Sequence, residues 1–143
     1  MNIQSTRRHH HDGFTLLEMV IVLAIFGILV AIAWPAYQKH IRQTRLQDAR
    51  AALLENGQFM ERFYAQNGRF KATSTTWPAL PRTETEHFNL TFSGGARGTL
   101  PDTYKLQAIA KDKEAEPRWL VLDHHQMVQL CIKNNNKTTC AEF

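Results

Sequence analysis

A run of twenty residues without a formal charge, Met19–Gln38, constrains this chain more than any other feature. The run consists mostly of Val, Ile, Leu and Ala, and a helix of that length rises about 30 Å, which is the hydrocarbon thickness of a bilayer. The remainder is polar, because 15 basic side chains accompany 11 acidic ones from Lys39 onward. With 143 residues, the chain has room for one small domain beside this segment. These features exclude a plain cytoplasmic globule, a multi-pass transporter and a disordered chain.

The residues before the apolar run do not form an ordinary secretory signal. Residues 1–13 are polar and basic, with Arg7 and Arg8, and the apolar stretch begins only after Gly13. A cut after the stretch would discard it, whereas a cut before it leaves the stretch on the mature protein. The positive-inside rule predicts that the basic leader stays cytoplasmic, so we expect the C-terminal domain on the outer side.

Two residues fit a simple membrane anchor poorly. Glu18 lies one turn inside the apolar stretch, where an unpaired carboxylate costs up to about a few kcal/mol at membrane depth. Pro35 lies within a helical pattern, where proline removes a backbone hydrogen bond and tends to kink the helix. Each has an ordinary alternative, because Glu18 can snorkel to the headgroups and Pro35 can mark a helix end.

The apolar run continues directly from the segment Gly13-Phe14-Thr15-Leu16-Leu17-Glu18-Met19. Together they resemble the prepilin motif of type IV pilins and of the pseudopilins of type II secretion. The resemblance implies that a prepilin peptidase cuts between Gly13 and Phe14 and N-methylates the new amine of Phe14. It also implies that Glu18 pairs with the Phe14 amine of a neighbouring subunit during assembly, and that Pro35 bends the helix. Such a pair has a physical reason, because each charge is costly in an apolar fibre core and each neutralises the other.

Beyond the apolar run, the hydrophobic pattern changes from all-round to one-sided. Leu46, Leu53 and Met60 recur at intervals of seven, which is typical of a helix that packs one face on a core. The same stripe is widened by Ala49, Ala52, Asn56, Phe59, Phe63 and Tyr64. We therefore expect one helix over residues 15–66, with two helices separated at the proline as the alternative.

The C-terminal half predicts a small sheet. Residues 73–81 are rich in turn formers and cannot continue a helix. Four strand-like stretches follow, at residues 87–92, 103–110, 118–122 and 127–132. Their short connections favour an antiparallel meander with one face on the helix and the other in water. The predicted fold class is α+β, a long N-terminal helix packed on a four-stranded antiparallel sheet.

Two cysteines, Cys131 and Cys140, enclose a loop of about ten residues after the last predicted strand. In a domain outside the cytoplasm this spacing indicates a disulfide, which contributes about 2.5–3 kcal/mol in the loop-entropy model. A metal site is a weaker alternative because no CxxC or nearby His completes a ligand set. We expect His9-His10-His11 and His124-His125 to be solvated, and we expect no metal or cofactor.

The whole layout looks like a type IV pilin with a C-terminal disulfide loop. Residues 50–81, together with Gly94-Gly95-Ala96-Arg97-Gly98, are similar to PilE-like and ComP-like minor pilins, a group that includes DNA-uptake receptors. The domains expected on this basis are a cleaved leader at 1–13, the transmembrane and fibre-core half of the helix at 14–38, and a soluble globular domain at 39–143.

Nucleic-acid binding needs clustered Lys and Arg for the phosphates and further groups for the bases. We expect Arg97 and the lysines of the disulfide loop to reach one surface, because both segments lie at strand ends. The alternative is a mildly basic, solvated pilin surface, since Glu84, Glu86, Glu114 and Glu116 dilute the charge. The candidate DNA-binding residues are Trp77, expected to be exposed, with Arg82, Arg97, Lys105, Lys133 and Lys137.

The resemblance implies a minor type IV pilin. Such a subunit is stored in the bacterial inner membrane as a single-pass protein with a periplasmic C-terminal domain, and it is assembled into, or modulates, an extracellular pilus. The implied partners are other pilin subunits, the prepilin peptidase and the inner-membrane assembly machinery. Two alternatives stay open: a DNA-uptake receptor for natural transformation that binds double-stranded DNA, and a type II secretion pseudopilin.

An enzyme is not expected. The sequence has no Gly-x-Ser-x-Gly, no phosphate loop, no paired carboxylates in an apolar setting and no Cys/His couple. The resemblance makes the chain a substrate of the peptidase and methyltransferase rather than a catalyst.

Overall fold

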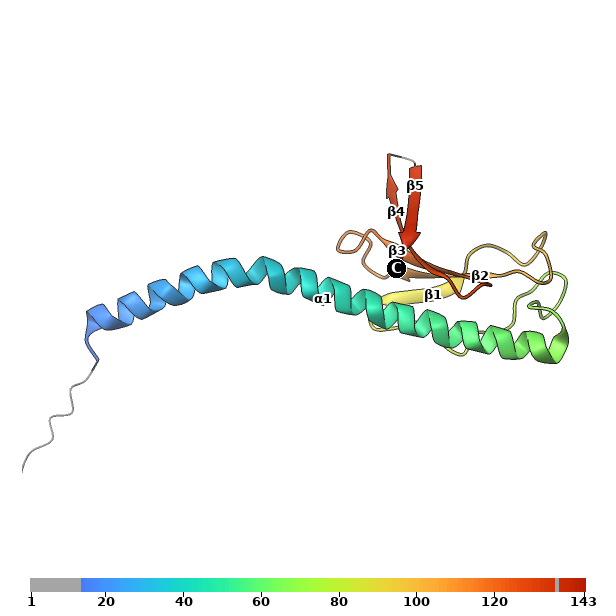
Figure 1. The fold of residues 1–143 in the computed structure, drawn as a ribbon, viewed down its shortest axis with the longest axis horizontal. Coiled ribbons are helices and arrows are strands. Elements are labelled where there is room, and N and C mark those ends of the chain that lie inside the picture. Colours follow the sequence, from blue (N-terminus) through green and yellow to red (C-terminus); the bar gives the residue numbers. More distant parts are fainter. Residues whose placement is uncertain (1–13, 136) are drawn as a thin grey trace, which may run out of the picture. The chain divides into compact units, whose positions relative to one another are not determined.

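In the computed structural model, residues 14–135 and 137–143 are described, and they form one long helix and an antiparallel sheet of five strands (Figure 1). The leader lies outside these residues, and so do Gly13 of the predicted cleavage site and the His9–His11 run. The predicted α+β class is confirmed. The elements are α1 (Leu16–Asn67), β1 (Phe88–Phe92), β2 (Lys105–Ala110), β3 (Trp119–Asp123), β4 (Val128–Asn134) and β5 (Lys137–Glu142).

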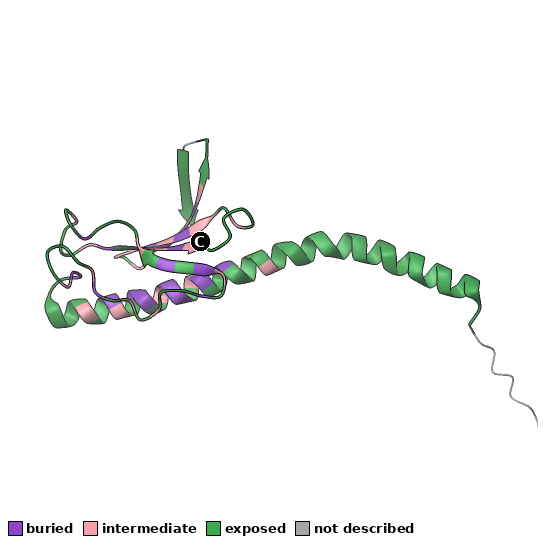
Figure 2. Ribbon diagram, turned by 180° about the vertical axis from the view of Figure 1, so that it is seen from behind, coloured by how far each residue is buried: buried purple, intermediate pink, exposed green. Residues whose placement is uncertain are grey.

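The chain divides between Lys39 and His40 into two units, and α1 contributes residues to both. In the N-terminal unit, every described residue is exposed, as the uniform green of this part of α1 shows in Figure 2. This part of the helix is long and apolar enough to cross a membrane. Pro35 lies inside α1, so the alternative of two helices separated at the proline is wrong.

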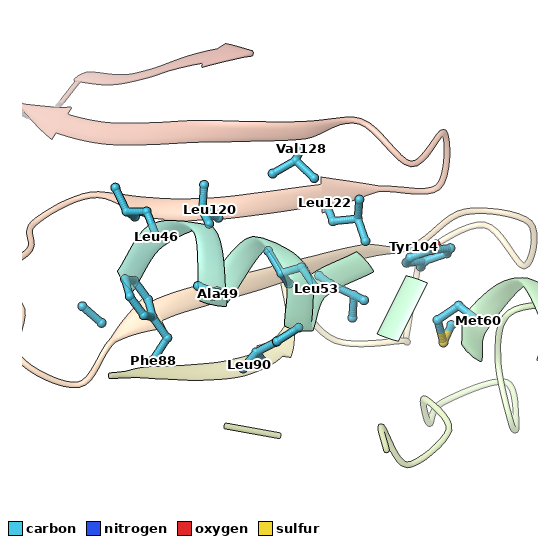
Figure 3. Packing of buried hydrophobic residues seen from close by; sticks show 14 of the residues in the cluster. Leu46, Ala49, Leu53, Met60, Phe88, Leu90, Tyr104, Leu120, Leu122 and Val128 are labelled. Atoms are coloured by element: carbon cyan, nitrogen blue, oxygen red, sulfur yellow. The ribbon is translucent and has the colours of Figure 1, made fainter. Parts of the chain in front are cut away.

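In the C-terminal unit, one face of α1 packs on the sheet. Figure 3 shows Leu46 and Leu53 of the helix among Leu120 and Leu122 of β3. The predicted stripe is largely confirmed, although Phe59 and Phe63 are only half-buried and Tyr64 is exposed. The residues of α1 that become buried are Leu46, Ala49, Ala52, Leu53, Asn56, Gly57 and Met60.

Two neighbouring residues of α1 fix the distance between the helix and its surroundings. A Cβ on Gly57 would lie 2.5 Å from Oε1 of Gln126 and 2.8 Å from Cδ2 of Leu122, so only glycine permits this close approach to the β3–β4 turn. The amide of Asn56 is buried, and its Nδ2 donates to the carbonyl of Arg82 at 2.6 Å while its Oδ1 accepts from the Arg82 N–H at 3.1 Å. Asn56 thereby satisfies a backbone donor and acceptor of the connecting segment.

The strands follow one another across the sheet in the order β1-β2-β3-β4-β5, and each pair is antiparallel. Side chains alternate as in a half-buried strand: Leu106, Ala108 and Ala110 of β2 are buried, whereas Gln107 and Ile109 between them point to the opposite face. The register places Gln107 opposite Val121. The sheet therefore has one face on α1 and one outer face, as expected.

The expected number of four strands is wrong, because β5 is a fifth strand. Cys131 and Cys140 occupy opposite positions on β4 and β5, so the predicted disulfide is confirmed but links two paired strands instead of closing a loop beyond the sheet. The β4–β5 hairpin projects from the sheet away from α1 (Figure 1). Every described residue of β5 is exposed, and its sequence KTTCAE lacks apolar alternation, so pairing with β4 and the disulfide, and not burial of side chains, hold it in the sheet.

Candidate assembly and nucleic-acid-binding surfaces

The N-terminal end of α1 combines a helix cap with an acidic residue. Thr15 precedes the helix, and its hydroxyl accepts a hydrogen bond from the N–H of Glu18 at 3.2 Å. This bond satisfies one of the N–H groups that the first turn of a helix leaves without a partner. The carboxylate of Glu18 makes no hydrogen bond or ion pair within residues 14–135 and 137–143, and Phe14 is exposed. The arrangement leaves a carboxylate and a bulky apolar residue open at the end of the helix.

Trp77 is half-buried, so the expectation of an exposed aromatic is wrong. Its ring stacks on Phe92, with ring centroids 4.7 Å apart and an interplanar angle of 5°. Its Nε1–H donates to the carbonyl of Gly94 at 3.1 Å. Trp77 therefore joins the segment after α1 to the loop between β1 and β2.

Arg82 lies beside α1 and is already paired. Its guanidinium lies 3.3 Å from a carboxylate oxygen of Glu55 and 3.8 Å from one of Asp48. Solvent-exposed pairs of this kind contribute little to stability, but two nearby carboxylates reduce the positive potential that would attract a phosphate. Among the predicted DNA-binding residues, Arg82 is the one whose surroundings suit that role least.

The other basic candidates lie at two opposite ends of the sheet. Arg97 in the β1–β2 loop and Lys105 at the start of β2 are at the end where β1 finishes. Lys133 and Lys137 flank the β4–β5 turn, at the end where β1 begins. Arg97 and the disulfide-loop lysines lie at strand ends as expected, but at opposite ends of the sheet, because successive antiparallel strands place these two turns there.

A groove of about 590 Å³ lies on the outer face of the sheet. Trp119 and Ile109 supply apolar surface, and Lys113, Arg118 and Lys133 supply positive charge. The lining residues are Ser93, Gln107, Ile109, Ala110, Lys113, Glu116, Pro117, Arg118, Trp119 and Lys133. Of the predicted DNA-binding residues, only Lys133 is among them. The alternation in β3, where Leu120 is buried, is a sequence signal that could have placed Trp119 on this face.

The charges in the groove are only partly neutralised. Arg118 forms a two-pronged pair with Glu116, with Nε and Nη2 at 2.6 and 2.7 Å from the two carboxylate oxygens. These hydrogen bonds raise the pKa of Arg118 above its ordinary value. Lys113 and Lys133 form no ion pair within the described part of the chain. Both lysines are exposed and free to contact an anion.

A smaller pocket of about 270 Å³ lies at the end of the sheet that carries Arg97. It brings Trp77 and Lys105 together with His124 of the β3–β4 turn and with the buried Tyr104. The Tyr104 hydroxyl accepts a hydrogen bond from Gln126 at 2.8 Å. Burial, reinforced by the negative charge of Glu61, raises the pKa of Tyr104 above its ordinary value.

Comparisons with known proteins match this layout. Residues 8–34 match the prokaryotic N-terminal methylation motif, and residues 35–118 match the family described as "Type IV minor pilin ComP, DNA uptake sequence receptor". The chain is 32% identical to the fimbrial protein EcpC of Eikenella corrodens over 103 residues, which are 69% of this chain and 66% of EcpC. It is 42% identical over 66 residues to the type IV major pilin protein PilE1 of Neisseria gonorrhoeae, covering 45% of this chain and 39% of PilE1. It thus spans less than two thirds of either relative.

The fold is similar to the solution NMR structure of the minor DNA-uptake pilin ComP from Neisseria subflava. The TM-score is 0.57 at 42% sequence identity, and the match covers 69% of this chain and 95% of ComP. A long apolar helix followed by a helix-packed antiparallel sheet is thus the architecture of a type IV pilin. This chain belongs to the ComP family of type IV minor pilins. It is a membrane-anchored pilus subunit, and the predicted main function, a minor type IV pilin, is confirmed.

Proposed function

We propose that this minor pilin binds double-stranded DNA on the outer face of its sheet and acts in DNA uptake for natural transformation. The observation that carries the proposal is the groove that Trp119 lines together with Lys113 and Lys133. The match of residues 35–118 to a family described as a DNA uptake sequence receptor supports the same function.

The dimensions of the sheet suit a duplex. A strand of six residues spans about 20 Å, and B-DNA rises about 3.4 Å per base pair, so the two ends of the sheet lie about six base pairs apart along a duplex. Arg97 and Lys105 at one end, and Lys133 and Lys137 at the other, would contact separate phosphates. The groove between them would face the base edges or the sugar–phosphate backbone. Separation of the basic residues is therefore compatible with one extended DNA interface.

Salt-dependent DNA binding by the detergent-solubilised full-length chain tests this proposal. Fluorescence anisotropy with a labelled duplex should show weak binding that decreases steeply between low and moderate salt. The double variant Lys113→Ala/Lys133→Ala should reduce the slope of log K against log salt by about 1.8, because each lost phosphate contact contributes about 0.9. The matched control is Arg45→Ala/Arg62→Ala, which removes the same charge from exposed positions on α1. Absence of wild-type binding at low salt, or equal losses in both double variants, would refute the proposal.

The same proposal includes the route of the subunit into the fibre. A prepilin peptidase cuts between Gly13 and Phe14 and methylates the Phe14 amine, and the single-pass subunit waits in the inner membrane with its C-terminal domain in the periplasm. Glu18 then pairs with the Phe14 amine of a neighbouring subunit, and the helix bends at Pro35. The methylation motif at residues 8–34 supports this route, and so does the open Glu18 carboxylate. The exposed apolar surface of the N-terminal unit gives lipid or other pilins a surface to cover.

Processing and incorporation test these steps separately. Gly13→Ala should leave full-length precursor in the membrane, and Glu18→Ala should be cleaved normally yet be depleted from sheared pili, because the Phe14 amine of the neighbour loses its counter-charge. Mass analysis of the N-terminal peptide and immunoblots of sheared fibres measure the two outcomes. Normal processing of the glycine variant, or wild-type fibre content of the glutamate variant, would contradict the assigned roles.

A further inference from the structure

The loop between β1 and β2, residues 93–104, presents Arg97 from a backbone that is tied down on both sides. Before Arg97, Gly94 accepts the hydrogen bond from the Trp77 indole at 3.1 Å. After it, the carbonyl of Thr99 accepts a hydrogen bond from the buried Lys71, and the carbonyl of Pro101 accepts one from the N–H of Phe70 at 2.8 Å. The segment immediately after α1 therefore holds both arms of the loop.

Without these ties the loop would have unusual freedom. Gly94, Gly95 and Gly98 lie within five residues, and Gly94 and Gly98 adopt φ values of 102° and 80°. Glycine loses more conformational freedom on ordering than any other residue, so a loop with three glycines is ordered only where other contacts hold it. Ala96, next to Arg97, is 2% exposed and anchors the centre of the loop. Arg97 itself is exposed.

Trp77 has no free hydrogen-bond donor for a base. One face of its ring is covered by Phe92, and its single hydrogen-bond donor is used by Gly94. Both contacts instead run to the end of β1 and the start of the loop. These two contacts hold the start of the loop in place, and we call them the Trp77 clamp.

We propose that Trp77 is a positioning residue for DNA binding, which holds the β1–β2 loop so that Arg97 is presented to a phosphate. This inference rests on the proposed DNA-binding function. A loop that is already ordered loses less entropy on binding, so the clamp contributes affinity without touching the DNA.

A double-mutant cycle on the detergent-solubilised full-length chain tests this role. Trp77→Ala should weaken duplex binding by about tenfold, since binding must then order the loop, and it should leave the salt slope unchanged. Arg97→Ala should reduce the salt slope by about 0.9 through loss of one phosphate contact. In the Arg97→Ala background, Trp77→Ala should weaken binding by less than about twofold, because the residue that it positions is gone.

Hydrogen exchange measures the loop without DNA. Amides of residues 94–99 should exchange faster in Trp77→Ala, while Trp77→Phe, which keeps the stacking on Phe92 and loses the N–H, should restore part of both protection and affinity. Thr75→Ala is the matched control, an exposed position in the same segment, and it should change neither quantity.

The outcomes separate the two proposals. Absence of duplex binding by the wild type would refute the proposed function and this role of Trp77 together. Additive losses in the cycle, or unchanged exchange of the loop in Trp77→Ala, would refute the positioning role alone and leave DNA binding intact.

Discussion

The two halves of α1 have the same secondary structure and opposite relations to the rest of the chain. Residues 40–67 bury a stripe against the sheet, whereas the residues of α1 up to Lys39 stay exposed although most of them are apolar. Burial against the sheet stabilises the stripe of residues 40–67 when the domain folds. The apolar surface of the N-terminal half has no such burial within the described chain, so we expect lipid or other subunits to cover it. Matched substitutions in the two halves should therefore report on different events, folding of the domain in one case and membrane insertion or assembly in the other.

The largest difference is expected for leucine truncation. Leu53→Ala should lower the free energy of unfolding of the C-terminal unit by about 2–5 kcal/mol, because it leaves a cavity at a position that is 0% exposed. Leu29→Ala, in the exposed half, should leave that quantity unchanged. Denaturant unfolding followed by near-ultraviolet circular dichroism in detergent measures both. Equal losses would mean that the two halves do not differ in the way described.

The two glycines of α1 sharpen the comparison. Gly57→Ala should destabilise the C-terminal unit by about 1–3 kcal/mol, because its new methyl group collides with Leu122 and Gln126. Gly27→Ala meets nothing within 4 Å, and it should favour the helix by about 0.5–1 kcal/mol because alanine loses less backbone entropy. Unfolding of the domain for the first variant and helicity in detergent for the second provide the measurements. A stabilising Gly57→Ala would show that the β3–β4 turn moves aside readily.

The smallest effect is expected from alkaline pH. The folded state keeps the Tyr104 proton above pH 10, where the unfolded chain releases it, because burial raises the pKa of Tyr104. The unfolded state then binds fewer protons, so the free energy of unfolding should fall as pH rises beyond about 10. Tyr104→Phe should flatten this decline, whereas Tyr37→Phe in the exposed half should not. A decline of the same steepness in all three proteins, measured by denaturant titration between pH 9 and 11.5, would exclude Tyr104 as its source.

Local periodicity made much of the fold predictable. The spacing of Leu46, Leu53 and Met60 identified the buried face, and the expected helix end at residue 66 differs by one from the observed Asn67. The fifth strand was missed because a strand at the edge of a sheet can form through backbone hydrogen bonds alone. Its side chains, from Lys137 to Glu142, are exposed and carry no alternating pattern.

The candidate site was less predictable, for two different reasons. The separation of Arg97 from Lys133 follows from the antiparallel meander itself, because each reversal moves the next turn to the other end of the sheet. That separation could therefore be predicted from the sequence. The stacking of Trp77 on Phe92 could not, since it joins an irregular segment to the end of a strand and depends on how the whole domain packs. Trp119 carries no charge, so the distribution of basic residues along the strands gives no indication of its place in the groove.

The link between Cys131 and Cys140 has a consequence for proteolysis. The two residues are nine positions apart in sequence, so the covalent ring encloses the entire β4–β5 turn. A protease that cut the chain inside that ring would leave the C-terminal fragment attached through sulfur. A nicked subunit would migrate as one band without reductant and as two with it, and a clipped hairpin tip would not by itself release the last strand from the domain.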